Sequence, residues 1–110
     1  MAAKFEMLKS KKGQFYFRLK AANGQVILTS EQYQTKASVQ AGITSVKANA
    51  KKDDRFERKT SSGGQPYFVL KAANGEPIGS SQMYKSTSSM ENGIASVKKS
   101  SSQAVVKDLS

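Results

Sequence analysis

The sequence predicts an α+β fold in which two similar halves of the chain share one antiparallel β-sheet. The segment Lys-Ala-Ala-Asn-Gly stands at 20–24 and again, unchanged, at 71–75. With the chain shifted by 51 residues, 22 of the 45 pairs between 4–48 and 55–99 are identical. In each half, alternation typical of strands gives way to the spacing of an amphipathic helix. Two copies are too few for a solenoid, so we expect two repeats with pseudo-twofold symmetry.

Three strands open the first repeat. In 4–8 the apolar Phe5 and Met7 share one face, and Glu6 lies on the other, where we expect it and its mate Glu57 to form cross-strand pairs with lysines. Residues 14–20 alternate more clearly. Their polar face carries Tyr16, Arg18 and Lys20.

An Asn-Gly turn and a helix complete the repeat. Asn23-Gly24 predicts a hairpin with a type I′ turn, which needs positive φ at both residues, and the third strand follows at 25–30. From Thr35, a plausible N-cap, apolar residues recur at helical spacing. Gly42 and its mate Gly93 cost helix stability, so we expect a close approach of helix to sheet there.

The second repeat follows the same plan with local changes. Pro66 and Pro77 replace apolar residues, and proline is confined to strand edges, strand starts or bulges. Ser88 and Glu91 have the spacing of a capping box. A final strand is expected at 104–107.

That last strand decides the predicted topology. Shifted by 51 residues it falls on 53–56, so in mid-chain the same strand is fused to the start of the second repeat. The prediction is two β-β-β-α-β repeats (4–54 and 55–110) in one domain spanning 1–110. They form one antiparallel sheet with both helices on one face. The C-terminal strands are swapped, so that Val105-Val106 lies near the Phe5 strand.

The predicted core consists of apolar positions that are matched between the repeats. They are Phe5, Phe17, Leu19, Ile27, Val39, Ile43 and Val46, with Phe56, Phe68, Leu70, Ile78, Met90, Ile94 and Val97 as their mates.

Several motifs together resemble a known family. They are the Gln-x-Tyr/Phe-Phe strands, the two Lys-Ala-Ala-Asn-Gly turns, Ser81-Gln82-Met83-Tyr84, the two Gly-Ile-x-Ser-Val-Lys segments and Val106-Lys107-Asp108. This combination, over essentially the whole chain, resembles the YegP-like family of small bacterial proteins. The resemblance implies two β-β-β-α-β repeats in a single sheet, and it implies no catalytic residues.

The residue types present exclude several kinds of chemistry. The chain has no histidine and no cysteine, which excludes Ser-His and Cys-His nucleophiles and the common zinc sites. Neither phosphate-binding nor dinucleotide-binding glycine patterns occur. A Ser-Lys dyad stays open because serines and lysines are abundant, but nothing in the sequence singles one out. We therefore expect a non-enzymatic protein with no cofactor, no metal and no evident small-molecule substrate.

The composition indicates where the protein is located and which kinds of partner it could bind. Eighteen Lys and Arg against eight Asp and Glu give a net charge of +10. Such an excess favours contact with polyanions, although spread lysines also serve solubility alone. No apolar run suits a membrane span or a signal peptide, so a cytoplasmic location is expected. Because the two repeats share one core within a single chain, we expect a monomer.

The uncovered face of the sheet is the candidate binding surface. Tyrosines interleaved with cations are typical of sheet surfaces that bind single-stranded nucleic acid. One alternative is a solvated face with no ligand. Another is a protein-interaction module that uses this face, or an edge strand left by Pro66 or Pro77, to bind an acidic protein or a partner strand. Homodimerisation through the face is a third possibility. The candidate residues are Tyr16, Arg18, Lys20, Lys59, Tyr67 and Lys71.

Overall fold

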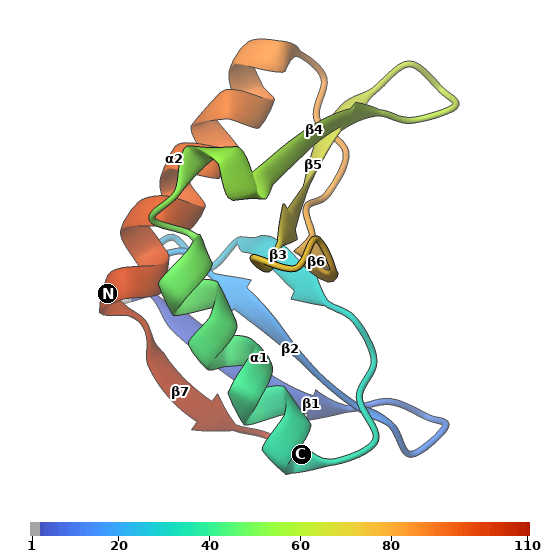
Figure 1. The fold of residues 1–110 in the computed structure, drawn as a ribbon, viewed down its shortest axis with the longest axis vertical. Coiled ribbons are helices and arrows are strands. Elements are labelled where there is room, and N and C mark those ends of the chain that lie inside the picture. Colours follow the sequence, from blue (N-terminus) through green and yellow to red (C-terminus); the bar gives the residue numbers. More distant parts are fainter. Residues whose placement is uncertain (1–2) are drawn as a thin grey trace.

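The structure is a computed structural model that describes residues 3–110, so Met1 and Ala2, the first residues of the predicted domain range, lie outside the described residues. Seven strands and two α-helices follow one another along the chain (Figure 1). Their bounds are β1 (Lys4–Lys9), β2 (Phe15–Lys20), β3 (Val26–Ser30), α1 (Lys36–Asn49), β4 (Phe56–Thr60), β5 (Pro66–Lys71), β6 (Pro77–Ser80), α2 (Thr87–Gln103) and β7 (Val105–Asp108), with a short 3₁₀ helix η1 (Asp53–Arg55) before β4.

The strands form one sheet in the order β4-β5-β6-β3-β2-β1-β7, and both helices pack on one face of it (Figure 1). The predicted α+β fold is therefore confirmed. The two repeats meet at the antiparallel pair of β3 and β6, where Thr29 lies opposite Ser80. These two residues are 51 positions apart, so the pseudo-twofold axis passes between them. On either side of this pair the strands are equivalent, since β2 corresponds to β5 and β1 corresponds to β4.

The last strand crosses to the first repeat, as the sequence predicts. β7 pairs with β1 in register, with Val106 beside Phe5. The pairing is parallel, so the sheet is antiparallel except at this edge. The equivalent residues of the first repeat lie in η1 and the start of β4, so they are fused to the second repeat and only one C-terminal strand is exchanged. Within the described sheet β4 is consequently an edge strand.

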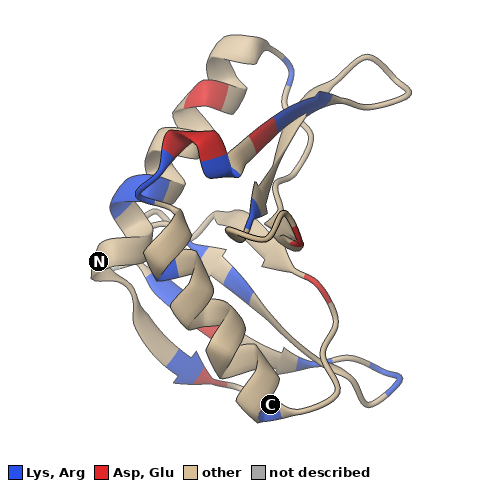
Figure 2. Cartoon of the chain, in the orientation of Figure 1, with Lys and Arg blue, Asp and Glu red and all other residues tan. Residues whose placement is uncertain are grey.

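This asymmetry explains a change between the repeats. Met7 of β1 is buried beside β7, whereas its mate Arg58 stands on the edge strand β4. Arg58 Nε donates to Glu91 of α2 at 2.6 Å, and its Nη2 donates to Asp53 at 3.1 Å. Figure 2 shows acidic and basic segments of η1, β4 and α2 gathered at this end of the molecule. An ion-pair network thus occupies the end of the core that β7 helps to close in the other repeat.

All fourteen predicted core residues are buried, each with at most 5% of its surface exposed. The phenylalanines of adjacent strands pack edge to face in both repeats, with ring centroids 5.8 Å apart for Phe5–Phe17 and 5.6 Å apart for Phe56–Phe68. Leu28 is also fully buried, and the sequence prediction missed it.

Two local predictions need correction. Only Gly24 of the Asn23-Gly24 pair has a positive φ, of 86°, so the turn is not type I′. Gly24 N–H donates to the Ala21 carbonyl and the register shifts at Leu19/Lys20, as in a longer hairpin loop that ends in a left-handed glycine. The capping box at Ser88 and Glu91 is also wrong. Ser86 caps α2 by accepting from Ser89 N–H, and Glu91 is engaged by Arg58.

The helix glycines have a specific packing role. A Cβ on Gly42 would lie 2.8 Å from the hydroxyl of Tyr33 and 3.0 Å from the ring of Phe17. A Cβ on Gly93 would clash in the same way with Tyr84, the mate of Tyr33. The predicted close approach is therefore present, and a tyrosine from the loop before each helix lies across the glycine.

Candidate binding surface on the uncovered sheet face

All six candidate residues project from the face that the helices leave uncovered. They alternate along their strands with buried core residues such as Phe17 and Phe68. Across the first repeat, Glu6 lies opposite Arg18, and in the second repeat Lys59 lies opposite Tyr67. The structure thus brings the predicted residues onto one face. It separates them into two groups, one in each repeat.

A buried carboxylate organises the first group. Glu6 is only 4% exposed, because long cationic side chains lie over it. Its Oε1 accepts a hydrogen bond from Arg18 Nε at 2.8 Å and lies 3.3 Å from Lys20 Nζ, and Lys4 Nζ is 3.7 Å from its Oε2. Burial alone would raise the pKa of this carboxyl, but hydrogen bonds from Arg18 and Lys20, and their charges, together hold the pKa below its ordinary value.

The second group has the same plan with a more open carboxylate. Glu57 pairs with Lys71 at 3.1 Å and with Lys59 at 3.2 Å, and its side chain is 41% exposed. Hydrogen bonds from Lys71 and then Lys59 hold the pKa of this carboxyl below its ordinary value. Val69 lies opposite Glu57 where Arg18 lies opposite Glu6, so this carboxylate lacks an arginine partner across the strand. The expected pairing of both glutamates with cations is present.

The charge balance of the face remains positive. The two glutamates form ion pairs with five cations, so these seven side chains together carry a net charge of +3. The sequence prediction singled out four of these cations but not Lys4. Lys4 is two residues from Glu6 on β1, so both side chains project from the same face of the sheet. The contact between them depends on the conformation of the lysine side chain in the folded protein.

The two candidate tyrosines are half-buried and far apart. β2 and β5 run in opposite directions, three strand positions apart, and Tyr16 and Tyr67 stand near the starts of these strands. Strand spacing and rise place them about 20 Å apart. Stacking on neighbouring bases is therefore excluded for this pair. They could contact bases separated by several nucleotides of one extended strand.

Two other kinds of feature are absent from residues 3–110. No group of three or more His, Cys, Asp or Glu side chains in this part of the chain could hold a metal ion. No helix among the same residues is long and apolar enough to cross a membrane.

A seven-stranded sheet built from two repeats, with a charged face opposite its helices, defines a class of small tandem-repeat α+β proteins. The family described as "Domain of unknown function (DUF1508)" matches residues 10–57 and 61–108, two ranges that are also 51 residues apart. The chain belongs to this family.

Relatives resemble the chain over nearly its whole length. The UPF0339 protein YegP of Shigella flexneri is 55% identical over 108 residues, which cover 98% of each chain. Solution NMR structures of two relatives have the same fold. The yegP protein of E. coli is 53% identical with a TM-score of 0.94, and the alignment covers 99% of this chain and 94% of that one. UPF0339 protein SO3888 of Shewanella oneidensis is 46% identical with a TM-score of 0.92, with 99% and 92% covered.

The matched glutamates give a prediction about stability. Glu6→Gln is expected to lower the free energy of unfolding at neutral pH by about 1–2 kcal/mol, because it removes one partner of a buried but solvent-screened ion cluster. Glu57→Gln, at the equivalent but more exposed position, should have a smaller effect. Urea denaturation of both variants measures the difference.

The pH dependence of this effect has a definite sign. The pKa of Glu6 is lower in the folded protein than its ordinary value of 4.5, so its contribution is present above that pH and is lost as the pH falls through the folded pKa. The gap between wild type and Glu6→Gln should therefore narrow in acid. A gap that widened below pH 4.5, or equal effects of the two substitutions at neutral pH, would contradict this account.

Proposed function

We propose that the protein is a non-enzymatic binding module that holds single-stranded nucleic acid on the uncovered sheet face. The observation that carries the proposal is the placement of Tyr16 and Tyr67 on a face with excess positive charge, since stacking and phosphate contacts are the two interactions such binding needs. A cytoplasmic location would fit this role.

The ion pairs favour an ordered surface. Arg18 and Lys20 are held by Glu6, and Lys59 and Lys71 by Glu57, so four cationic side chains are positioned before any ligand arrives. Ordering long side chains in advance reduces the entropy lost on binding. Each carboxylate is shared by more than one cation, so the cations keep an excess of charge for phosphates.

Fluorescence anisotropy with labelled single-stranded and duplex DNA and RNA, over a series of salt concentrations, tests the proposal. We expect micromolar or tighter binding of single strands that weakens as salt rises. Tyr16→Ala/Tyr67→Ala should weaken it at least about tenfold, since base stacking contributes about 1–3 kcal/mol per base.

A matched control removes charge away from the face. Lys51→Gln/Lys52→Gln deletes two positive charges between α1 and β4 and leaves the tyrosines and their neighbours intact. It should weaken binding less than the tyrosine variant. If the tyrosine variant binds like wild type while the lysine variant loses affinity, the attraction is generic electrostatics and the proposal fails.

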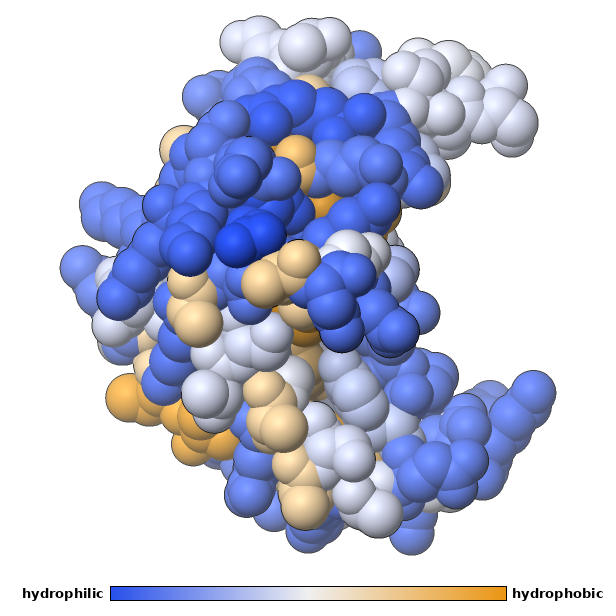
Figure 3. Space-filling model, viewed as in Figure 1, coloured by the Kyte–Doolittle hydropathy of each residue, from blue (hydrophilic) through white to orange (hydrophobic). Residues whose placement is uncertain are grey.

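Protein interaction is the second candidate, and one observation favours a particular edge. Pro66 and Pro77 stand at the starts of the interior strands β5 and β6, so the expected edge at these prolines is not formed. The edges are β4 and β7. On β7, Val105 is 61% exposed and Val106 47%, and Figure 3 shows a hydrophobic patch where β7 lies in Figure 1. An exposed apolar edge strand can pair with a partner strand.

A further inference from the structure

Two cavities of similar size lie between the repeats. The first, of about 300 Å³, is lined by the Asn23-Gly24 turn region of the first repeat and by Tyr84 and α2 of the second. The second, of about 380 Å³, is lined by the Asn74-Gly75 turn region of the second repeat and by Tyr33 and α1 of the first. Each cavity therefore needs both repeats, and each is large enough for a small ligand.

The two cavities are copies of one another. Of the ten residues that line the first, nine have their mates, 51 positions away, in the lining of the second. Seven of these pairs are identical, although only about half of all aligned pairs in the repeat are. The identical pairs are Ala21/Ala72, Asn23/Asn74, Ile27/Ile78, Tyr33/Tyr84, Ser38/Ser89, Gly42/Gly93 and Ser45/Ser96.

Turn formation does not account for all of this identity. The left-handed Gly24 and an asparagine that accepts from the backbone are explained by the hairpin alone. The loop tyrosines and helix glycines are explained by their packing on each other. The helix serines Ser45 and Ser96 face the turn of the other repeat and contribute neither to that turn nor to this packing. A ligand site shared by the turn and the helix would retain both sets of residues.

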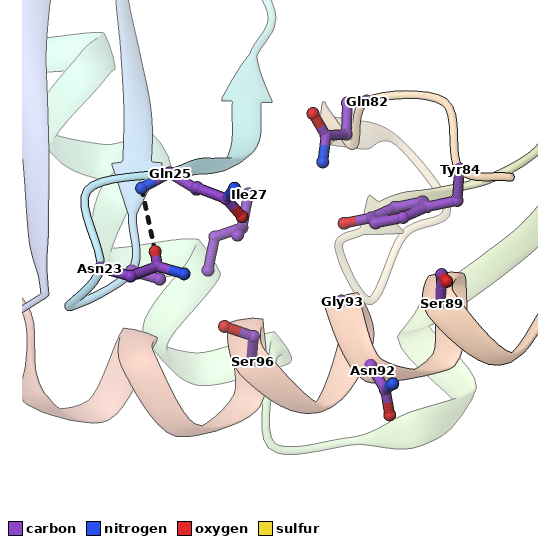
Figure 4. A pocket seen from close by; sticks show the side chains of 10 residues that line it. Asn23, Gln25, Ile27, Gln82, Tyr84, Ser89, Asn92, Gly93 and Ser96 are labelled. Carbon is purple, nitrogen blue, oxygen red and sulfur yellow. Dashed lines mark hydrogen bonds between the residues drawn. The ribbon is translucent and has the colours of Figure 1, made fainter.

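Polar groups converge on the first cavity, as Figure 4 shows. Asn23 Oδ1 accepts from Gln25 N–H at 3.0 Å, which leaves the amide NH₂ of Asn23 to face the cavity. The hydroxyls of Ser96 and Tyr84 and the amide of Gln82 point toward the same space, and Ile27 adds an apolar wall.

Tyr84 is fixed with its hydroxyl in this space. Its ring stacks on Phe68, with centroids 6.3 Å apart and planes 14° apart, and it can lie across α2 because residue 93 is glycine. Burial raises the pKa of this hydroxyl, an effect that a hydrogen bond with Gln82 partly opposes. The hydroxyl therefore stays protonated at neutral pH and can both donate and accept hydrogen bonds.

The lining indicates the chemistry of the ligand. The first cavity is lined by amides, hydroxyls and small apolar side chains, with no charged residue among them, and the second differs mainly in having Glu76 at the place of Gln25. Amides and hydroxyls that donate and accept are suited to hydroxyl groups, and a charged ligand would have no counter-ion in the first cavity. We infer that the two cavities are a duplicated binding site for an uncharged, hydroxyl-rich molecule about the size of a monosaccharide.

The test is an NMR titration of the ¹⁵N-labelled full chain. Glucose, galactose, ribose and N-acetylglucosamine are the probes, each added to high millimolar concentration. At least one should shift the amide signals of Gln25, Tyr84 and Ser96 together with those of their mates Glu76, Tyr33 and Ser45. If no probe shifts either set, the inference is overturned.

Two variants make the assignment specific. Ser96→Leu fills the first cavity and should abolish the shifts there while those of the second cavity persist, and Ser45→Leu should do the reverse. Tyr84→Phe keeps the ring, removes the hydroxyl, and should weaken binding at the first cavity several-fold. Shifts that persist in all three variants would contradict the site. Because these cavities adjoin the helices, Ser96→Leu should leave nucleic-acid binding unchanged, which separates this inference from the proposed function.

Discussion

Phe68→Ala is expected to lower the free energy of unfolding by about 3–5 kcal/mol, a large part of the stability of a protein of this size. Phe68 has no exposed surface, and its ring packs edge to face against Phe56 and stacks on Tyr84. Removing it leaves a cavity that these two rings cannot easily fill. Urea or thermal denaturation followed by circular dichroism measures the loss.

The repeat supplies its own comparison. Phe17 is the mate of Phe68, is equally buried and packs against Phe5 in the same geometry, so Phe17→Ala should have a cost of the same size. Each variant should still unfold in one transition, because helices from both repeats contact strands of both repeats. If either substitution left the unfolding midpoint unchanged, the assignment of these side chains to the core would be wrong.

Gly79→Ala is expected to disrupt the seam between the repeats, with a loss of about 1–3 kcal/mol or more. A Cβ on Gly79 would lie 2.7 Å from the carbonyl oxygen of Thr29 and 3.2 Å from Cα of Ser30. Both neighbours are backbone atoms of β3, so the clash is relieved only by moving the strands apart at the central pair, where β3 of the first repeat meets β6 of the second. Denaturation measurements give the size of this effect.

Gly63→Ala is the matched control for this substitution. At Gly63 a Cβ would meet only the Ser61 hydroxyl, at 3.9 Å, so its stability should stay close to that of wild type. Equal stability of the Gly79→Ala and Gly63→Ala variants would show that β3 and β6 are not packed as closely as described.

Gly79 also illustrates what the sequence could not reveal. Its mate is Leu28, which is fully buried, so the repeat alignment alone suggests a lost core residue. The physical reason lies in the symmetry. Close to the pseudo-twofold axis, β3 and β6 pair with each other. The position of Leu28 has room for a large side chain, whereas the equivalent position of Gly79 faces the backbone carbonyl of Thr29. The pairing of β3 with β6 is a tertiary contact, and an alignment of the two repeats with each other does not reveal it.

Most of the fold, in contrast, was predictable from local patterns. Alternation placed Phe17 and Leu19 on the core face, and the helical spacing of Val39, Ile43 and Val46 identified the buried side of α1. The predicted capping box of α2 was wrong because other residues form the interactions assigned to Ser88 and Glu91. Ser86 caps α2 instead of Ser88, because the helix begins at Thr87, and Glu91 pairs with Arg58 from a distant strand.

The uncovered sheet face could be predicted from the sequence to a larger extent than the two cavities between the repeats. The uncovered face follows from alternation along single strands, so the sequence alone places Tyr16, Arg18 and Tyr67 on it. Burial of Glu6 under three cations was not predictable, since it depends on the length of side chains from two strands. The paired cavities were missed because each joins a turn of one repeat to a helix of the other.

Chemical-shift mapping of the ¹⁵N-labelled protein with a short oligothymidylate tests the central claim, that the uncovered face binds single strands, most directly. The account predicts that the largest shifts occur at β2 and β5, around Tyr16, Arg18 and Tyr67, and that they fade as salt is raised. Shifts confined to the lysines of α2 and the segment before β4, with β2 and β5 unchanged, would contradict it and would leave the sheet face without its proposed ligand.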